Sequence, residues 1–362
     1  MKKIPDLIIL ALLFVILSCN TPWCKTDFAG KISGKRLIMN MGRSKYIVLF
    51  MWLSCVISAF TQRLKFDAAG HFKIVQFTDV HYIPDNPKSK IAIRLIDEVL
   101  EQEKPDLVVL TGDIVTGHPA KKGWDSVLSP VLQQNIPFMV TLGNHDDEQD
   151  LSRKQVAELV VSYPLNLNTI CVDSVTGYLN DALPIMGHMS GRPAFLLYGL
   201  DSNNYSTIQG IKGYGWFTPD QIEWYNCQSC YYKSLNEGKA LPALAFFHIP
   251  LPEYRIAYDM RKNRKSGKRR EKECAPELNT GMYATMLLNG DVIGMFTGHD
   301  HGNDYIALYN GIALAYGRFS GGKTTYTKTS NGARIIELQE GKRGFSTYIR
   351  LLDGKIVGRS EF

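Results

Sequence analysis

The chain of 362 residues has little that marks a membrane-embedded or a disordered protein. Its two longest apolar runs, 7–17 and 46–60, fall short of the roughly 20 residues that a membrane-spanning helix needs. Hydrophobic residues make up 45% and charged residues 21%, without the bias of a disordered chain. No internal repeat or interdomain linker is found between 72 and 357. The sequence predicts a leader, 1–61, followed by one domain, 62–362.

A net positive charge is absent from most of the chain although the formal net charge is +6. Residues 1–61 carry a net charge of +6 and 261–272 carry +7, so the rest carries about −7. A nucleic-acid binder spreads Lys and Arg over a face or groove, so we do not expect a nucleic-acid partner. The basic stretch 261–272 either overhangs a functional site and attracts polyanionic substrates or forms a solvated flexible loop.

Two signal-like segments follow one another within 1–61, each with basic residues before an apolar run of signal-peptide length. The first ends at Ser18-Cys19, which resembles a bacterial lipoprotein box. Two hypotheses explain the tandem. Either translation starts at Met39 or Met41 and the preceding residues are upstream read-through, or Cys19 is lipidated and attaches the protein to a membrane. Both predict an exported protein that is periplasmic, in the cell envelope or secreted.

Cysteine is scarce beyond the leader, where only Cys171, Cys227, Cys230 and Cys274 remain. Cys227 and Cys230 have CxxC spacing, but without a second pair they do not predict a zinc knuckle. The motif follows no strand-to-helix turn, which argues against a redox site. A disulfide in an oxidising compartment and a pair of partly buried helix thiols both stay open.

Five short apolar runs each end in a turn rich in Gly, Asp, Asn or His. Apolar runs of four or five residues bounded by turn signals predict buried strands. The turns are Thr78-Asp79-Val80-His81, Thr111-Gly112-Asp113, Gly143-Asn144-His145-Asp146-Asp147, His248-Ile249-Pro250 and Thr297-Gly298-His299-Asp300-His301.

Helical patterns separate several of these strands, which predicts an α/β fold with a central sheet. One apolar helix face lies within 91–100, Ser152 is a plausible N-cap, and Thr218–Gln221 contains a capping box with Pro219 at the first helical position. From residue 304 onward short strands replace this pattern. We expect them to form a second sheet packed on the first, from Tyr305–Leu308, Gly311–Tyr316, Ala333–Leu338 and Phe345–Leu351.

Side chains at the carboxyl ends of strands converge on one edge of a sheet, so these turns predict a common site. Asp, Asn and neutral His suit divalent metals, and their number exceeds what one tetrahedral ion needs. Two ions sharing a carboxylate would use all of them, as in the clamps that promote displacement at phosphorus. Each motif alone is commoner as a turn, a helix cap or a core histidine. Together and in this order they predict a dinuclear metal site.

The motifs D-x-H, G-D, G-N-H-D, H and G-H-x-H resemble the signature of the calcineurin-like metallophosphoesterase superfamily over roughly 71–350. Residues 247–254, 197–202 and 213–216 are similar to the branch that holds plant purple-acid-phosphatase-like proteins and a yeast phosphatase. The resemblance implies a four-layer α/β fold, a two-sheet β-sandwich flanked by helices.

The resemblance also implies a ligand set with Asp113 bridging two ions. His145 would be the non-ligand histidine beside the leaving group, oriented by Asp146. One metal would be held by Asp79, His81, Asp113 and His301, and the other by Asp113, Asn144, His248 and His299.

One departure concerns the metal itself. Purple acid phosphatases place a metal-ligating Tyr three residues after the bridging Asp, and this chain has Thr116 there. We therefore expect no ferric-tyrosinate colour, and manganese, iron and zinc are all reasonable ions.

The implied reaction is hydrolysis of a phosphate ester, with hydroxide from a water that bridges the two cations attacking phosphorus and His145 assisting the leaving group. Phosphomonoesters, small or macromolecular, are the leading substrates. Phosphodiesters such as nucleotides or phospholipid-like diesters are the alternative, and a non-catalytic envelope-binding protein is a third. Three residues could bind substrate oxygens, although helix capping and sheet packing would explain them equally well: Asn279, Tyr316 and Arg318.

Overall fold

Three parallel strands form one half of the first of two sheets in the computed structural model, which describes residues 64–170, 175–327 and 329–362 of the unit Phe60–Phe362. The strand order is β13-β12-β11-β1-β2-β3. The strands are β1 (His71–Phe77), β2 (Leu107–Thr111), β3 (Phe138–Thr141), β11 (Gly332–Gln339), β12 (Phe345–Leu351) and β13 (Ile356–Glu361). The predictions on the leader, including Cys19, and on Cys171 lie outside the described residues.

The second sheet has the order β4-β5-β6-β8-β10-β9-β7, with β5, β6, β8 and β10 parallel. Its strands are β4 (Asp181–Met186), β5 (Pro193–Gly199), β6 (Ala243–Phe246), β7 (Lys265–Ser266), β8 (Val292–Thr297), β9 (Ile306–Tyr309) and β10 (Ile312–Tyr316).

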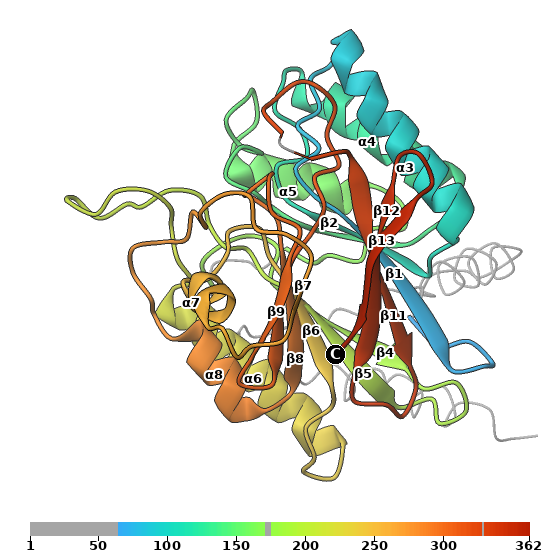
Figure 1. Cartoon of the computed structure of the whole chain (residues 1–362), viewed down its shortest axis with the longest axis vertical. Coiled ribbons are helices and arrows are strands. Elements are labelled where there is room, and N and C mark those ends of the chain that lie inside the picture. The colour runs from blue at the N-terminus through green and yellow to red at the C-terminus, as the bar shows by residue number, and fades with distance from the viewer. Residues whose placement is uncertain (1–63, 171–174, 328) are drawn as a thin grey trace, which may run out of the picture. The chain divides into compact units, whose positions relative to one another are not determined.

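Inner strands of both sheets are buried on both faces, which explains the apolar sequences of β2, β3, β6, β8 and β10. Along β1, Phe72 and Ile74 face the layer between the sheets, whereas Val75 and Phe77 face the helices. The strands of the second sheet alternate in the same way. The result is four layers, helices–sheet–sheet–helices (Figure 1), as the resemblance implied.

Helices cover the outer face of each sheet. Against the first sheet pack α3 (Lys90–Glu103), α4 (Ala120–Gln133) and α5 (Arg153–Ser162), with the short η1 (Pro87–Ser89) before α3. Against the second pack α6 (Pro219–Leu235), α7 (Glu253–Asp259) and α8 (Met282–Asn289). Both predicted caps are present, because Ser152 and Thr218 form capping boxes with Gln155 and Gln221. Among the described helices, none has both the length and the apolarity to cross a membrane.

The predicted arrangement of the C-terminal strands is wrong. β9 and β10 join the sheet of β6 and β8, while β11 and β12 join the sheet of β1. The five motif-bearing strands are therefore divided between the two sheets rather than placed in one. A strand buried on both faces carries no pattern that assigns it to a sheet, which is why sequence reasoning missed the division.

Candidate metal centre

Five strand ends from the two sheets bring their polar turns together. β1, β2 and β3 end before Asp79, Asp113 and Asn144, and β6 and β8 end before His248 and His299. Parallel strands present their carboxyl ends at one edge, and the packing of the sheets places the two edges side by side. This juxtaposition builds two donor clusters.

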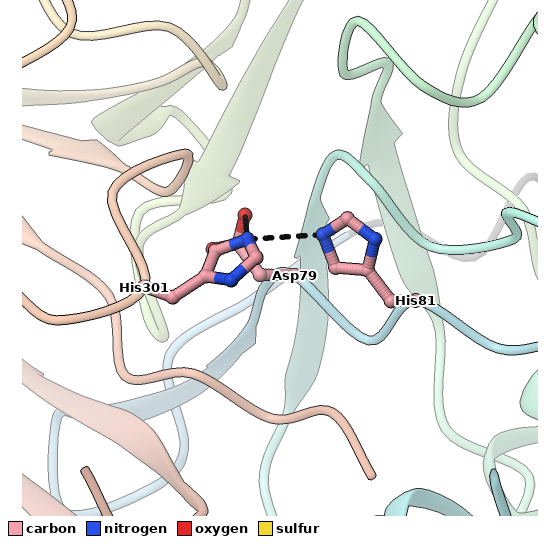
Figure 2. A group of neighbouring side chains, drawn as sticks. All are labelled: Asp79, His81 and His301. Atoms are coloured by element: carbon pink, nitrogen blue, oxygen red, sulfur yellow. Dashed lines mark hydrogen bonds and ion pairs between the residues drawn. The ribbon is translucent and has the colours of Figure 1, made fainter. Parts of the chain in front are cut away.

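The first cluster consists of Asp79, His81 and His301, all buried (Figure 2). Nε2 of His81 and Nε2 of His301 face each other at 3.0 Å, and Oδ1 of Asp79 lies 3.6 Å from the latter atom. Burial lowers the pKa of His81 to about 3, so this imidazole is neutral. A neutral imidazole is the form that binds a metal.

The second cluster consists of Asp113, His248 and His299, also buried. Oδ2 of Asp113 lies 3.2 Å from Nε2 of His248 and 3.6 Å from Nε2 of His81. One carboxylate oxygen thus faces both clusters. Although burial raises the pKa of Asp113, the adjacent His248 and His81 outweigh it and hold the pKa well below its ordinary value.

Asn144 adds an amide beside the second cluster. Its Nδ2 donates to the hydroxyl of Tyr205 at 3.2 Å, whereas its buried Oδ1 has no hydrogen-bond partner among the described residues. An unpaired buried carbonyl oxygen is costly unless a cation satisfies it. This atom fits the role of a metal ligand.

Backbone carbonyls fix the orientation of two imidazoles. Nδ1 of His248 lies 2.8 Å from the carbonyl of Thr111, and Nδ1 of His301 lies 2.8 Å from that of Tyr326. Each Nδ1–H donates outward, so in the neutral imidazole the lone pair is on Nε2, inside the site. Metal-binding histidines are oriented by outer contacts of this kind.

The backbone of the site is held in an unusual conformation. Four non-glycine residues have positive φ: Asp79 (53°), His81 (45°), Asp113 (53°) and His299 (78°). Strain of this kind concentrates at functional sites, where surrounding contacts maintain it. Gly143 is required for another reason, because a Cβ there would overlap the Asp113 carboxylate.

The donor set fits two divalent cations held by carboxylate, imidazole and amide groups without thiolate. Asp79, His81 and His301 would hold one, and Asn144, His248 and His299 the other, with Asp113 between them. The two clusters contain six of the seven residues that the sequence assigned to metal binding, and the seventh, Asn144, lies in the turn whose neighbouring residues Gly143 and His145 contact Asp113.

His145 lies beside the centre, with its ring centroid 5.7 Å from that of His81. The predicted orienting partner of its imidazole is wrong, because the Asp146 carboxylate bonds to backbone amides instead. Asp146 is buried and accepts from the backbone amides of Gly143, Asp113, Ile114 and Val115, which joins the two turns. The carboxylate beside Nδ1 of His145 belongs instead to Glu148, at 2.5 Å. The sequence could not predict which carboxylate orients His145, because Asp146 and Glu148 are both acidic and only the geometry of the turn distinguishes their positions.

The three residues predicted to bind substrate have structural contacts instead. The buried Tyr316 hydroxyl donates to Asp300 at 2.6 Å, and buried Arg318 pairs with Asp304 and donates to the carbonyl of Ser330 at 2.7 Å. Asn279 is exposed and bonds to Glu253 and the amide of Gly281. Strand-end position alone cannot reveal that a side chain turns into the core.

The basic stretch is anchored to the domain in part. Arg269 pairs with Asp259 and Glu273, and Arg270 pairs with Asp304, 2.9 Å away. These ion pairs contradict a wholly solvated loop. Cys227 and Cys230 are exposed free thiols on α6, and Cys274 is also free.

Sequence reasoning missed several aromatic residues around the centre. Tyr214 meets the His299 ring edge-on at 4.2 Å, and Tyr205 stacks on Tyr214. Tyr326 stacks on His301 from the other side at 4.4 Å. The segment 213–216 matches the family branch in sequence, but its sequence does not predict contact with the metal ligands.

Known proteins share both the sequence and the fold of this chain. Residues 72–303 match the family model described as calcineurin-like phosphoesterase. The chain is 32% identical over 339 residues to "Probable inactive purple acid phosphatase 29" of Arabidopsis thaliana, covering 82% of this chain and 86% of that protein. It is 33% identical to "Phosphatase DCR2" of Saccharomyces cerevisiae, covering 80% of this chain and 55% of the yeast protein.

Two solved structures have the same fold at low sequence identity. A dimetal phosphatase from Danio rerio matches 80% of this chain and 98% of its own at 15% identity, with a TM-score of 0.57. The purple acid phosphatase PPD1 of yellow lupin matches 81% of this chain and 54% of its own at 12% identity, with a TM-score of 0.51. With its strand-end motifs joined in one centre, the chain belongs to the calcineurin-like phosphoesterase family.

Proposed function

We propose that the protein is an exported, metal-dependent phosphatase that hydrolyses phosphomonoesters. The observation that carries the proposal is the position of Asp113, whose Oδ2 lies within 3.6 Å of imidazoles from both donor clusters. Two cations at this centre would supply an activated water and neutralise charge on the phosphate. A homologue that has lost its catalytic activity usually lacks some of the metal ligands, whereas this sequence contains all seven.

The residues of the chain have separable roles in this reaction. The seven ligands hold the ions, and Asp146 holds the Asp113 and Gly143 turns in register through backbone amides. His145, 38% exposed at its side chain, can reach a substrate from solvent. In its protonated form it would donate through Nε2 to the departing alkoxide, which a general acid must do when the leaving group is basic.

The decisive assay compares p-nitrophenyl phosphate with bis-p-nitrophenyl phosphate, using protein loaded in turn with Mn²⁺, Fe²⁺ and Zn²⁺. We expect preference for the monoester. A clear preference for the diester would replace the proposal with a phosphodiesterase acting on nucleotides or phospholipid-like diesters. Inactivity on both with two ions bound would favour a binding protein, a reading consistent with the words "probable inactive" in the names of several relatives.

Export is a separate part of the proposal and rests on the sequence of 1–61 alone. Mass spectrometry of the native N-terminus tests it. Cleavage after the second apolar run would support a start at Met39 or Met41, whereas lipid on Cys19 would establish membrane attachment. An intact N-terminus with no cleavage or lipid would contradict export.

A further inference from the structure

A chain of hydrogen bonds joins the leaving-group histidine to a metal-binding amide. Nδ1 of His145 lies 2.5 Å from Oε2 of Glu148, and Oε1 of Glu148 accepts from the Tyr205 hydroxyl at 2.7 Å. The same hydroxyl oxygen accepts from Nδ2 of Asn144 at 3.2 Å. With one donor proton and two lone pairs, a tyrosine hydroxyl can serve both partners at once.

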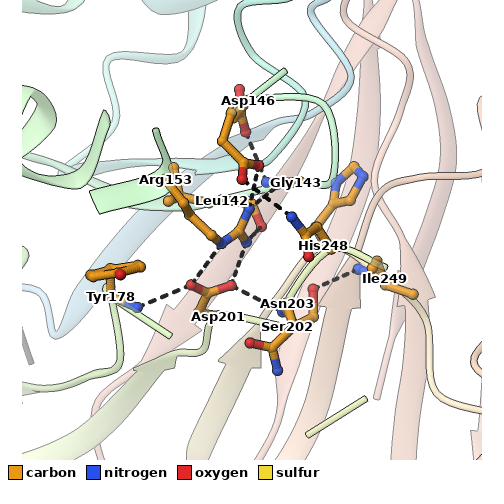
Figure 3. Close-up of polar contacts among 12 residues, drawn as sticks. Leu142, Gly143, Asp146, Arg153, Tyr178, Asp201, Ser202, Asn203, His248 and Ile249 are labelled. Carbon is orange, nitrogen blue, oxygen red and sulfur yellow. Dashed lines mark hydrogen bonds and ion pairs between the residues drawn. The ribbon is translucent and has the colours of Figure 1, made fainter. Parts of the chain in front are cut away.

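Tyr205 comes from the loop after β5, in the opposite sheet from the Gly143–Glu148 turn, and an ion-pair clamp joins the two. The partly buried Arg153 forms two contacts with Asp201 and donates to the carbonyls of Gly143, at 2.7 Å, and Leu142, at 3.3 Å (Figure 3). Nearby, Nδ2 of Asn204 donates to Asp147 at 3.2 Å.

A small hairpin keeps the Tyr205 ring in place. The amide of Ser206 donates to the carbonyl of Gly213 at 2.9 Å, and the Tyr205 ring stacks on Tyr214, with 5.9 Å between centroids. Because the ring is held by stacking and the loop by the clamp, the hydroxyl has little freedom to leave its two partners.

We propose that Glu148 and Tyr205 are positioning residues that fix two groups together: the imidazole of His145 and the amide of Asn144. Glu148 holds Nδ1 of His145, so that Nε2 is presented to the substrate. Tyr205 holds Nδ2 of Asn144, so that the unpaired Oδ1 is directed to the ion. The inference rests on the proposed function and names residues outside the ligand set.

Two variants separate these effects. Tyr205→Phe removes the hydroxyl and keeps the stacked ring. Glu148→Gln removes the negative charge and turns one acceptor oxygen into an amide donor, so His145 and Tyr205 can no longer both donate to residue 148. Tyr163→Phe is the matched control, because it removes a 2.6 Å hydroxyl–carboxylate bond between the end of α5 and Asp125 of α4.

Kinetics with two leaving groups provide the main test. For both variants we expect kcat to fall about tenfold or more on an alkyl phosphate and much less on p-nitrophenyl phosphate, with KM nearly unchanged, because a basic leaving group depends most on an oriented acid. Tyr205→Phe should also lower the affinity for one of the two Zn²⁺ ions about tenfold, whereas Glu148→Gln and Tyr163→Phe should leave both affinities unchanged. Equal losses on both substrates, or no loss, would overturn the proposal.

An independent readout does not require turnover. In zinc-loaded protein with labelled histidine, the Nδ1–H proton of His145, assigned by its loss in His145→Ala, should resonate downfield because it faces a carboxylate. It should move upfield in Glu148→Gln and stay in place in Tyr163→Phe. An inactive wild type would refute the proposed function alone, while an unmoved resonance would refute the positioning role.

Discussion

Oδ2 of Asp113 lies 3.2 Å from Nε2 of His248, a histidine carried by the other sheet. The carboxylate and the imidazole are both buried, and each has its other side occupied: Oδ1 of Asp113 accepts from the amide of His145 at 2.9 Å, and Nδ1 of His248 bonds to Thr111. The contact therefore joins the two sheets at the point where two ions would share a ligand.

Asp113→Ala should bind neither ion, because the residue faces both clusters. Metal analysis of purified protein after reloading with Mn²⁺ or Zn²⁺ would measure this against two ions per chain for the wild type. Asp125→Ala, on the exposed face of α4, is the control and should keep both. Retention of one ion by Asp113→Ala would show that the carboxylate does not bridge.

His145→Ala should keep both ions and lose roughly 10²- to 10⁴-fold in kcat on an alkyl phosphate, the range typical of a lost general acid. Steady-state kinetics and metal content would be measured on the same preparation. His188→Ala, in the turn after β4, should behave as the wild type. Full activity of His145→Ala on an alkyl ester would remove the residue from the reaction.

Iron-loaded protein should show no tyrosinate-to-iron charge-transfer band, because Thr116 occupies the position of the tyrosine ligand. A visible absorption spectrum after anaerobic loading and oxidation would measure it. Tyr326 is the residue to examine if a band is found, since its ring stacks on His301. A band abolished in Tyr326→Phe would contradict the expectation and identify the ligand.

Arg153→Ala should lower the free energy of unfolding by about 3–5 kcal/mol, because it leaves the buried Asp201 carboxylate without its charged partner. Urea unfolding would measure the loss. Arg94→Ala, which breaks an exposed pair with Glu98, should cost no more than about 0.5 kcal/mol. Equal losses of unfolding free energy in the two variants would mean that the Arg153–Asp201 pair stabilises the protein no more than an exposed ion pair does.

Glu103 gives a pH-dependent contribution to stability. Burial raises its pKa, but hydrogen bonds from Tyr348, Arg350 and Lys73 outweigh burial and bring the pKa below its ordinary 4.5. A carboxylate with a lowered pKa in the folded state stabilises the fold above its unfolded pKa, and that contribution is lost as the pH falls through the folded pKa.

The stability difference between wild type and Glu103→Gln should therefore be larger at pH 7 than near pH 3, measured by urea unfolding at each pH. Glu98→Gln, in an exposed pair on the same helix, serves as the control. A difference that is constant with pH would contradict the ionised role of Glu103.

The five motif-bearing strands, the caps of α5 and α6, and the Asp and His donors of the two clusters could be predicted from the sequence. Buried strands that end in Asp, His or Asn can be predicted because the polarity and turn propensity of each residue are local properties of the sequence. The sequence also suggested the reaction class, since seven such donors in one order fit few other chemistries.

How these parts meet could not be predicted from the sequence and follows from long-range packing. The division of the motif-bearing strands between two sheets depends on pairing across long separations, and strands apolar on both faces do not encode it. The partner of His145 depended on turn geometry, which placed Asp146 on backbone amides and Glu148 on the imidazole. Tyr205 lies at the site because the Arg153–Asp201 ion pair joins its loop to the Gly143 turn, and no local sequence signal predicts this long-range contact. The buried contacts of Tyr316 with Asp300 and of Arg318 with Asp304 likewise depend on tertiary packing.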